Sequence, residues 1–158
     1  MTGRRGEPSA RELLICRVGA KLCGLPLEHV RETMRPLPLQ TLSHMPSFVR
    51  GLSVIRGEPV PVLDARRLLG SSAAADPGRY VTLVLGQRRA ALAVDDVLGV
   101  RQVSSEKFAQ LPAVLSEAEN RHVEMLGLLD AELLLVLQHA QLLPDELWPQ
   151  LEQEVRQG

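Results

Sequence analysis

The sequence contains few of the residues that nucleic-acid binding requires. Aromatic residues make up only 3% of its 158 positions, with two Phe, one Tyr and one Trp. Few rings are therefore available to stack on nucleic-acid bases. The formal net charge is −1, which provides no long-range field to attract nucleic acid or an anionic membrane. We therefore expect no nucleic-acid partner.

Cysteines and long apolar segments are scarce as well. No segment approaches the roughly 18 apolar residues that span a bilayer, and the polar stretch MTGRRGEPSA predicts neither a signal peptide nor an anchor. We expect a cytoplasmic protein with no direct membrane insertion, in which Cys16 and Cys23 are buried free thiols. A two-residue hairpin loop at Gly19-Ala20 would place these cysteines opposite each other, where a disulfide is geometrically possible.

Motifs that carry catalysis or bind metals are missing. The four histidines are scattered, and the sequence has no Cys-x-x-Cys, His-Glu-x-x-His or glycine-rich phosphate loop. Asp64, Asp95 and Asp96 could supply an acid–base pair in a cleft. Alternatively, Asp64 caps a short helix by accepting from the N–H groups of Arg66 or Arg67, while the other two face solvent or pair with a basic residue. We favour the cap, and expect no catalytic residues, no cofactor and no metal.

Short β-strands dominate the pattern that is present, and the length allows one compact unit or two small ones sharing a core. Apolar segments between turn residues predict strands at 13–18, 22–30, 52–56, 60–63, 80–85, 90–97, 123–129 and 133–137. Consecutive apolar positions within them indicate strands that are covered on both faces. Short helices are expected at 46–49, 64–69 and 106–110, and a longer one at 144–157 in which Pro149 should cause a break or kink.

Two segments of the sequence are repeated later in the chain. Residues 13–30 align without a gap with residues 80–97, an offset of 67, and residues 56–69 align with residues 130–143, an offset of 74. The order of hairpin, connection, hairpin and acidic residue is the same in both copies. This order predicts two similar β-subdomains, packed together with a seam between them.

Two prolines interrupt one of the most apolar stretches, GLSVIRGEPVPVLDARRLLG at 51–70. Backbone N–H groups two residues apart in a strand point the same way, so Pro59 and Pro61 remove donors from one side of their strand. Proline is tolerated at the edge of a sheet with that side outward. We therefore predict an edge strand here.

The same stretch resembles the signature of the CheW-like coupling domain of bacterial chemotaxis. The residues that match it, in order, are Gly51, Arg56-Gly57, Pro61-Val62 and Asp64. Further similarities are Val30 and Glu32 in GLPLEHVRETM, Pro46 with Phe48, and ALAVDDV at 91–97. Together they cover residues 11–143. Departures include Val54-Ile55, where the family usually has Asn before the Leu-Arg-Gly, and Gln138, where an Asp is common.

The resemblance implies a mostly β fold of two small five-stranded SH3-like barrels side by side, with short helices and a C-terminal helix. It divides the chain into a disordered N-terminus (1–10), a CheW-like domain (11–143) and a helical tail (144–158). The domain comprises two intertwined subdomains, and the second hairpin block begins at about residue 80.

The implied function is that of a non-enzymatic adaptor between two partners. One is the regulatory domain of a CheA-type histidine kinase, and the other is the cytoplasmic tip of a methyl-accepting chemoreceptor. The pathway could govern swimming, pili or surface motility. Carried over by position, the partner-binding residues are Val30, Glu32, Gly51, Arg56 and Gly57.

Two side-chain roles and one other function stay open at this point. Arg56 could bind a partner carboxylate, pair within the chain with Glu32 or Glu58, or stay solvated in its turn. The apolar face of the last helix, around Trp148, could dock on the chain's own barrels or on a partner. The alternative function is a small-molecule sensor or an enzyme that uses the cleft between the barrels.

Overall fold

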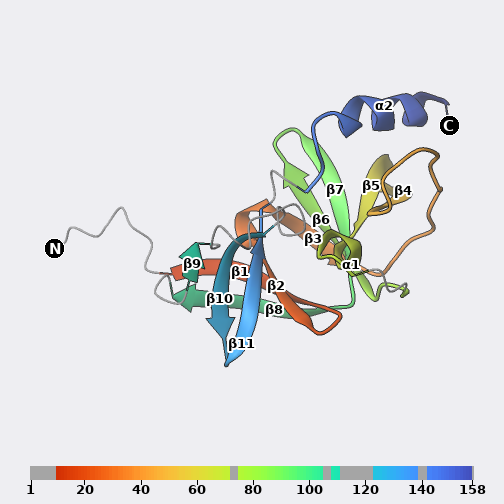
Figure 1. The fold of residues 1–158 in the computed structure, drawn as a ribbon. Helices are drawn as coiled ribbons and strands as arrows, with labels where there is room; N and C mark the ends of the chain where they lie inside the picture. Colours follow the sequence, from red (N-terminus) through yellow and green to blue (C-terminus); the bar gives the residue numbers. More distant parts are fainter. Residues whose placement is uncertain (1–9, 72–74, 105–107, 111–122, 139–141, 158) are drawn as a thin grey trace.

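Two β-sheets lie side by side, and a C-terminal helix packs along one of them (Figure 1). The computed structural model describes residues 10–71, 75–104, 108–110, 123–138 and 142–157. The first repeat contains β1 (Ala10–Val18), β2 (Lys21–Pro26), the 3-10 turn η2 (Leu27–His29), β3 (Val30–Met34), β4 (Val49–Ile55), β5 (Glu58–Asp64) and α1 (Ala65–Leu68). The second contains β6 (Arg79–Leu85), β7 (Arg88–Val94), β8 (Asp96–Ser104), β9 (Phe108–Gln110), β10 (Val123–Leu129) and β11 (Glu132–Leu137), followed by α2 (Leu147–Gln157).

The predicted duplication is confirmed by the backbone pairing. At the offsets read from the sequence, β1, β2 and β3 correspond to β6, β7 and β8, and β4 and β5 correspond to β10 and β11. Equivalent pairs keep the same register: Val30 lies opposite Leu83, as Val97 lies opposite Cys16, and each pair adjoins a β-bulge. The two repeats are therefore copies in structure.

Neither repeat forms a sheet by itself. The six-stranded sheet has the order β8-β1-β2-β11-β10-β9, and the five-stranded sheet has the order β3-β6-β7-β5-β4. Each sheet thus takes one hairpin from one repeat and its remaining strands from the other. The repeats are joined by the parallel pairs β2–β11 and β5–β7 and by the antiparallel pairs β1–β8 and β3–β6. The subdomains are interlocked, because separating the repeats would break both sheets.

Apolar side chains form a core inside each sheet and a third core between the sheets. Along β1, Leu13 and Ile15 point into the six-stranded sheet's own core, while Leu14 and Cys16 point into the shared core. The five-stranded sheet has its own core around Tyr80. Strands covered on both faces account for the consecutive apolar positions, as the sequence predicted.

The two α-helices among the described residues agree with two of the four helix predictions. Asp64 caps α1 as expected, accepting from the N–H groups of Arg66 and Arg67 at 3.0 and 3.4 Å. The helix α2 begins at Leu147, so Pro149 is its third residue. A break at Pro149 is therefore a wrong prediction, because N–H groups in a first helical turn have no partner within the helix.

The other two helix predictions are wrong. Residues 46–49 form a single turn, in which the N–H of Val49 donates to the carbonyl of Pro46 at 3.0 Å before β4 starts. Phe108–Gln110 is strand β9, paired with β10, and the residues just before it lie outside the described part. Sheet pairing with a distant strand overrides a weak local helical pattern. The predicted strand at 22–30 is also divided, by the 3-10 turn Leu27–His29.

The prolines do not mark an edge strand, because β5 lies between β4 and β7. The two-residue turn before β5 directs the N–H groups of alternate residues from Glu58 onward toward β4. Pro59 and Pro61 therefore have their missing donors on the side of β7. The ladder to β7 includes only Val62, Leu63 and Asp64. The prolines thus keep the first half of β5 unpaired on that side.

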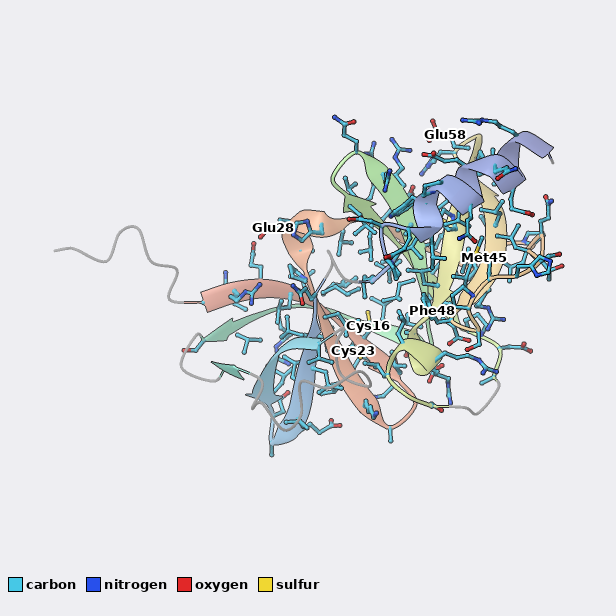
Figure 2. All side chains as sticks on the ribbon, turned by 45° about the horizontal axis from the view of Figure 1, so that its top comes forward. Cys16, Cys23, Glu28, Met45, Phe48 and Glu58 are labelled. Carbon is cyan, nitrogen blue, oxygen red and sulfur yellow. The ribbon has the colours of Figure 1, made fainter. Side chains whose placement is uncertain are left out.

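The two cysteines lie directly opposite each other across β1 and β2, as the hairpin predicted. Both are free and buried in the shared core (Figure 2). Burial raises the pKa of the Cys16 thiol to about 12 and also raises that of Cys23. Both thiols are therefore protonated near neutral pH, where they act as small apolar side chains.

Candidate functional site

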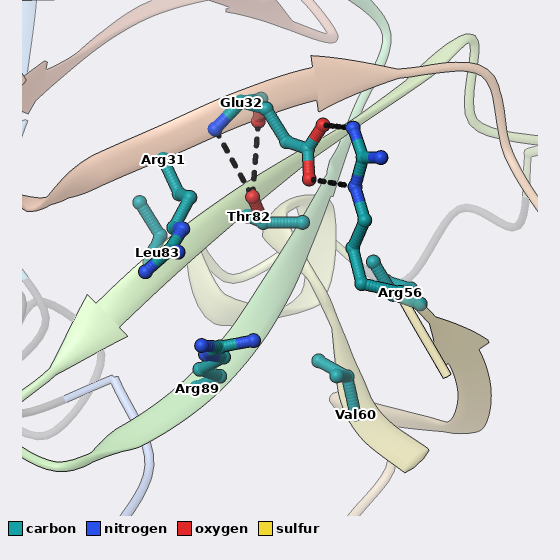
Figure 3. A pocket seen from close by; sticks show the side chains of 8 residues that line it. Arg31, Glu32, Arg56, Val60, Thr82, Leu83 and Arg89 are labelled. Atoms are coloured by element: carbon teal, nitrogen blue, oxygen red, sulfur yellow. Dashed lines mark hydrogen bonds and ion pairs between the residues drawn. The ribbon is translucent and has the colours of Figure 1, made fainter. Parts of the chain in front are cut away.

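A pocket opens in the five-stranded sheet between β3 and the turn that joins β4 to β5 (Figure 3). Its volume is about 380 Å³. Three arginines and one carboxylate line it together with apolar side chains and a threonine: Arg31, Glu32, Ile55, Arg56, Val60, Thr82, Leu83 and Arg89. Two of the predicted partner-binding residues, Glu32 and Arg56, lie here.

Glu32 and Arg56 form a forked ion pair across the mouth of this pocket. The guanidinium of Arg56 donates to the two carboxylate oxygens of Glu32 at 2.7 and 3.1 Å. The pair joins β3, at one edge of the sheet, to the turn after β4, at the other edge. This hydrogen bond holds the pKa of Glu32 below its ordinary value and raises that of Arg56. Arg56 is therefore paired within the chain, one of the three roles left open.

The turn that carries Arg56 has the backbone geometry of a type I′ hairpin. Arg56 and Gly57 have φ values of 54° and 81°, and this turn needs positive φ at both central residues. A Cβ atom at position 57 would meet nothing within 4 Å. Gly57 is therefore required by backbone conformation and not by a close neighbour, and it presents Arg56 to Glu32.

The remaining predicted residues have different surroundings. Val30, at the start of β3, is half-buried and packs against the shared core. Gly51 lies inside β4 with φ at 149°, and a Cβ atom there would collide with the carbonyl oxygen of Gln40. The structure thus brings Glu32, Arg56 and Gly57 together, with Val30 on the same strand as Glu32. Gly51 instead allows the backbone at Gln40 to approach β4 closely.

Sequence reasoning missed Thr82, Arg31 and Arg89. The Thr82 hydroxyl accepts from the N–H of Glu32 at 3.1 Å and donates to its carbonyl at 3.2 Å, bridging a β-bulge in β3. Arg31 occupies that bulge. Aligning β3 with β8 could have indicated Arg31, because Arg31 stands where the second repeat has Leu98. Nothing in the local sequence distinguishes Arg89 from Arg88.

Three carboxylates were considered for acid–base chemistry. Asp64 and Asp95 are bound separately to arginines, whereas Asp96 accepts from the N–H of Val97 at 2.9 Å. Asp64 accepts from Arg50 at 3.0 Å while it caps α1. Asp95 accepts from Arg66 at 2.8 and 3.1 Å, and also from the N–H of Gly19. Both side chains thus hold loops and repeats together. Within the described residues, no cluster of three or more His, Cys, Asp or Glu side chains could hold a metal ion.

The helix α2 packs on the five-stranded sheet and on the shared core. Trp148 and Leu151 are buried, and the guanidinium of Arg88 lies 4.9 Å from the centre of the Trp148 ring. This docking on the chain's own barrels is one of the two alternatives predicted for the apolar face. Neither described helix has both the length and the apolar character needed to cross a membrane.

The paired sheets define a fold that is also seen in a solved structure. The crystal structure of the scaffolding protein TtCheW from Thermoanaerobacter tengcongensis matches with a TM-score of 0.74 at 20% identity, covering 82% of this chain and 89% of that one. The fold is therefore the SH3-like two-subdomain fold.

Sequence comparisons give the family. The family model of the CheW-like domain matches residues 12–147. A chemotaxis protein CheW from Klebsiella aerogenes is 26% identical over 143 residues, 89% of this chain and 86% of that protein. Protein FrzA from Myxococcus xanthus is 37% identical over 95 residues, 59% of either chain. This chain belongs to the CheW-like domain family.

Proposed function

We propose that this chain is a non-enzymatic adaptor that couples a methyl-accepting chemoreceptor to a CheA-type histidine kinase. The observation that carries the proposal is the CheW-like domain that covers residues 12–147. Two similar proteins support it, because TtCheW is a scaffolding protein and the Klebsiella relative is a chemotaxis protein. In this role the chain works in the cytoplasm without inserting into the membrane.

The two subdomains provide separate surfaces on one rigid body. Their shared core and exchanged strands fix the geometry of one sheet relative to the other. An adaptor with this construction holds two partners in a fixed arrangement, so that the state of the receptor can bias the kinase. The kinase's regulatory domain and the receptor's cytoplasmic tip are the partners we propose.

We propose that the surface formed by Val30, Glu32, Arg56 and Gly57 contacts at least one of these partners. Gly51 supports this surface from within β4, because it lets the segment at Gln40 approach the strand. Asp64 and Asp95, which an enzyme or sensor in the cleft would use, are already bound to Arg50 and Arg66. We therefore favour the adaptor over the alternative function.

The test is a reconstitution with the kinase regulatory domain and the receptor tip from the same organism. We expect the wild-type chain to bind each partner by calorimetry and to form a ternary complex in size-exclusion chromatography. Arg56→Asp should keep the native circular dichroism spectrum and weaken at least one of the two complexes.

The matched control is Arg79→Asp, at an exposed position whose side chain, among the described residues, bonds only to the carbonyl of Gly78. This control should bind like the wild type. Unchanged binding of both partners by Arg56→Asp would remove Arg56 from the interface. A wild-type chain that binds neither partner would contradict the proposed function.

A further inference from the structure

The pocket between β3 and the β4–β5 turn contains more positive than negative charge. Arg31, Arg56 and Arg89 line it, whereas Glu32 is its only acidic lining residue among those described. This excess is local, since the whole chain has a formal net charge of −1. Arg31 comes from β3 and Arg89 from β7.

Arg31 and Arg89 keep more bonding capacity for a further anion than Arg56 does. Arg56 binds both carboxylate oxygens of Glu32 through Nε and Nη2. Arg89 gives one nitrogen to Glu58 at 3.2 Å, and its side chain is 40% exposed. The side chain of Arg31 makes no hydrogen bond with any residue that the structure describes. Its charge contributes to the lowered pKa of Glu32, so its field reaches the pocket.

The floor of the pocket is apolar and firmly packed. Ile55, Val60 and Leu83 line it with only 6%, 3% and 1% of their surfaces exposed. The two hydrogen bonds of Thr82 fix the main chain of β3 beside it. A rigid apolar floor below guanidinium groups fits a side-chain pair in which one member is apolar and the other acidic.

Comparison of the repeats indicates that neither arginine is needed for the fold. The position equivalent to Arg31 is Leu98, which is 51% exposed on β8. The position equivalent to Arg89 is Leu22, which is buried inside the six-stranded sheet. The same backbone is therefore built with leucine at both places. The two arginines are free to serve a binding role.

We propose that Arg31 and Arg89 make this pocket an acceptor for an acidic side chain of the protein partner, with an adjacent apolar side chain resting on the floor. The inference rests on the proposed function, because it specifies the chemistry of one partner's contact. Arginine suits this role because its planar guanidinium binds a carboxylate through two parallel hydrogen bonds.

The test compares Arg31→Gln, Arg89→Gln and the double variant with the wild type by calorimetry, using the kinase regulatory domain and the receptor tip separately. We expect each single change to weaken one of the two complexes about tenfold, and the double variant to weaken it more. Raising the salt from about 50 to 300 mM should weaken the wild-type complex more than that of the double variant. Arg79→Gln removes the same charge from a position outside the pocket, and should bind like the wild type.

A mutant cycle then identifies the acidic partner residue. Single Glu→Gln and Asp→Asn changes across the binding partner should include one that weakens the wild-type complex but has little further effect on the double variant. Absence of such a residue would contradict the proposal.

The outcomes distinguish this inference from the function on which it rests. If the wild type binds neither partner, the adaptor function and the inference both fail. If the wild type binds and the double variant binds equally well, only the inference fails. Free succinate serves as a probe of the alternative occupant. If succinate raises the melting temperature of the wild type but not of the double variant, and partner binding is the same in both, the pocket takes a small molecule and the proposal is overturned.

Discussion

The two sheets have the same backbone topology in their equivalent strands. In each sheet an ion pair joins the same two elements, but the acidic and basic residues are exchanged. In the five-stranded sheet, Glu32 on β3 binds Arg56 in the β4–β5 turn. In the six-stranded sheet, Arg101 on the equivalent strand β8 binds Asp130 in the equivalent β10–β11 turn at 3.1 Å. The same two elements are joined, with anion and cation exchanged. A duplicated backbone can thus present two electrostatically different surfaces, as an adaptor with two partners requires.

The sheets also differ where their repeats interlock. The β2–β11 ladder starts at Leu134, whereas the β5–β7 ladder starts at Val62, which corresponds to a position two residues later. Pro59 and Pro61 account for the delay, because they remove donors on that side of β5. A groove at this point is lined by both prolines and by Trp148 and Leu151 of α2. The unpaired strand is thus bordered by the helix.

The largest expected effect on stability comes from a glycine inside a strand. Gly51 in the five-stranded sheet is compared with Gly99 in the six-stranded sheet. Gly51→Ala should lower the free energy of unfolding by about 3 kcal/mol, because a Cβ atom collides with the Gln40 carbonyl and the backbone is strained. Urea denaturation measures the change. Gly99→Ala is the control, since its φ is also positive but nothing lies within 4 Å; it should cost clearly less. Equal losses would mean that strain, and not the collision, sets the requirement.

The next effect tests the ion pair of Asp95 with Arg66, whose equivalent position in the second repeat is Ala140. Asp95 binds Arg66 and the N–H of Gly19, while its equivalent, Glu28, is 77% exposed beside His29. Asp95→Ala should cost about 2 kcal/mol, because it leaves a partly buried arginine and N–H group without their acceptor. Glu28→Ala should change the melting temperature hardly at all. Similar losses from both would show that Asp95 does not hold the repeats together.

The two hairpin turns give a smaller, paired effect. Gly57 has φ at 81° and its equivalent, Ala131, has φ at 68°. Gly57→Val should destabilise the chain by about 1–2 kcal/mol, because a β-branched residue is strained at positive φ. Ala131→Gly should stabilise it by up to about 1 kcal/mol by relieving that strain. The melting temperature should fall for Gly57→Val and rise for Ala131→Gly. Shifts in the same direction would contradict the shared turn type.

The smallest expected effect is on the pH dependence of folding stability. It comes from one carboxylate in each sheet that forms an ion pair with an arginine of another element. Hydrogen bonds from Arg56 and Arg17 hold the pKa values of Glu32 and Glu132 below their ordinary value of 4.5. A lowered folded pKa adds stability above the unfolded value, which is lost as the pH falls through the folded value. Glu32→Gln and Glu132→Gln should each reduce the loss of urea stability on going from about pH 6 to pH 3. Variants as acid-sensitive as the wild type would contradict this.

Much of the fold could be predicted from the sequence, because the equivalent strands of the two repeats have similar sequences. The offsets, the Asp64 cap and the pairing of Cys16 with Cys23 all depend on residues close in sequence or on the alignment of the copies. The family resemblance implied intertwined subdomains, but no pattern in the residues themselves predicted which strands are exchanged. The pairs that produce the exchange, parallel β2–β11 and β5–β7 and antiparallel β1–β8 and β3–β6, join distant segments and leave no local pattern.

The candidate site was predictable only in part. The family resemblance indicated Glu32 and Arg56, and their ion pair was one of three roles considered for Arg56. Arg31 and Arg89 reach the same pocket from different strands. Their convergence depends on the bulge in β3 and on the register of β6 with β7, neither of which the sequence specifies. The meeting of these side chains across strands therefore could not be predicted from the sequence.

The interlocking of the repeats, on which the account of a rigid adaptor depends, is tested most directly by cutting the chain between them. Fragments 1–71 and 75–158 each contain one repeat. We expect neither fragment alone to unfold cooperatively on heating, and the two co-expressed fragments to purify as a 1:1 complex with the wild-type circular dichroism spectrum. A native-like spectrum and a cooperative transition for either fragment alone would contradict the exchange of strands.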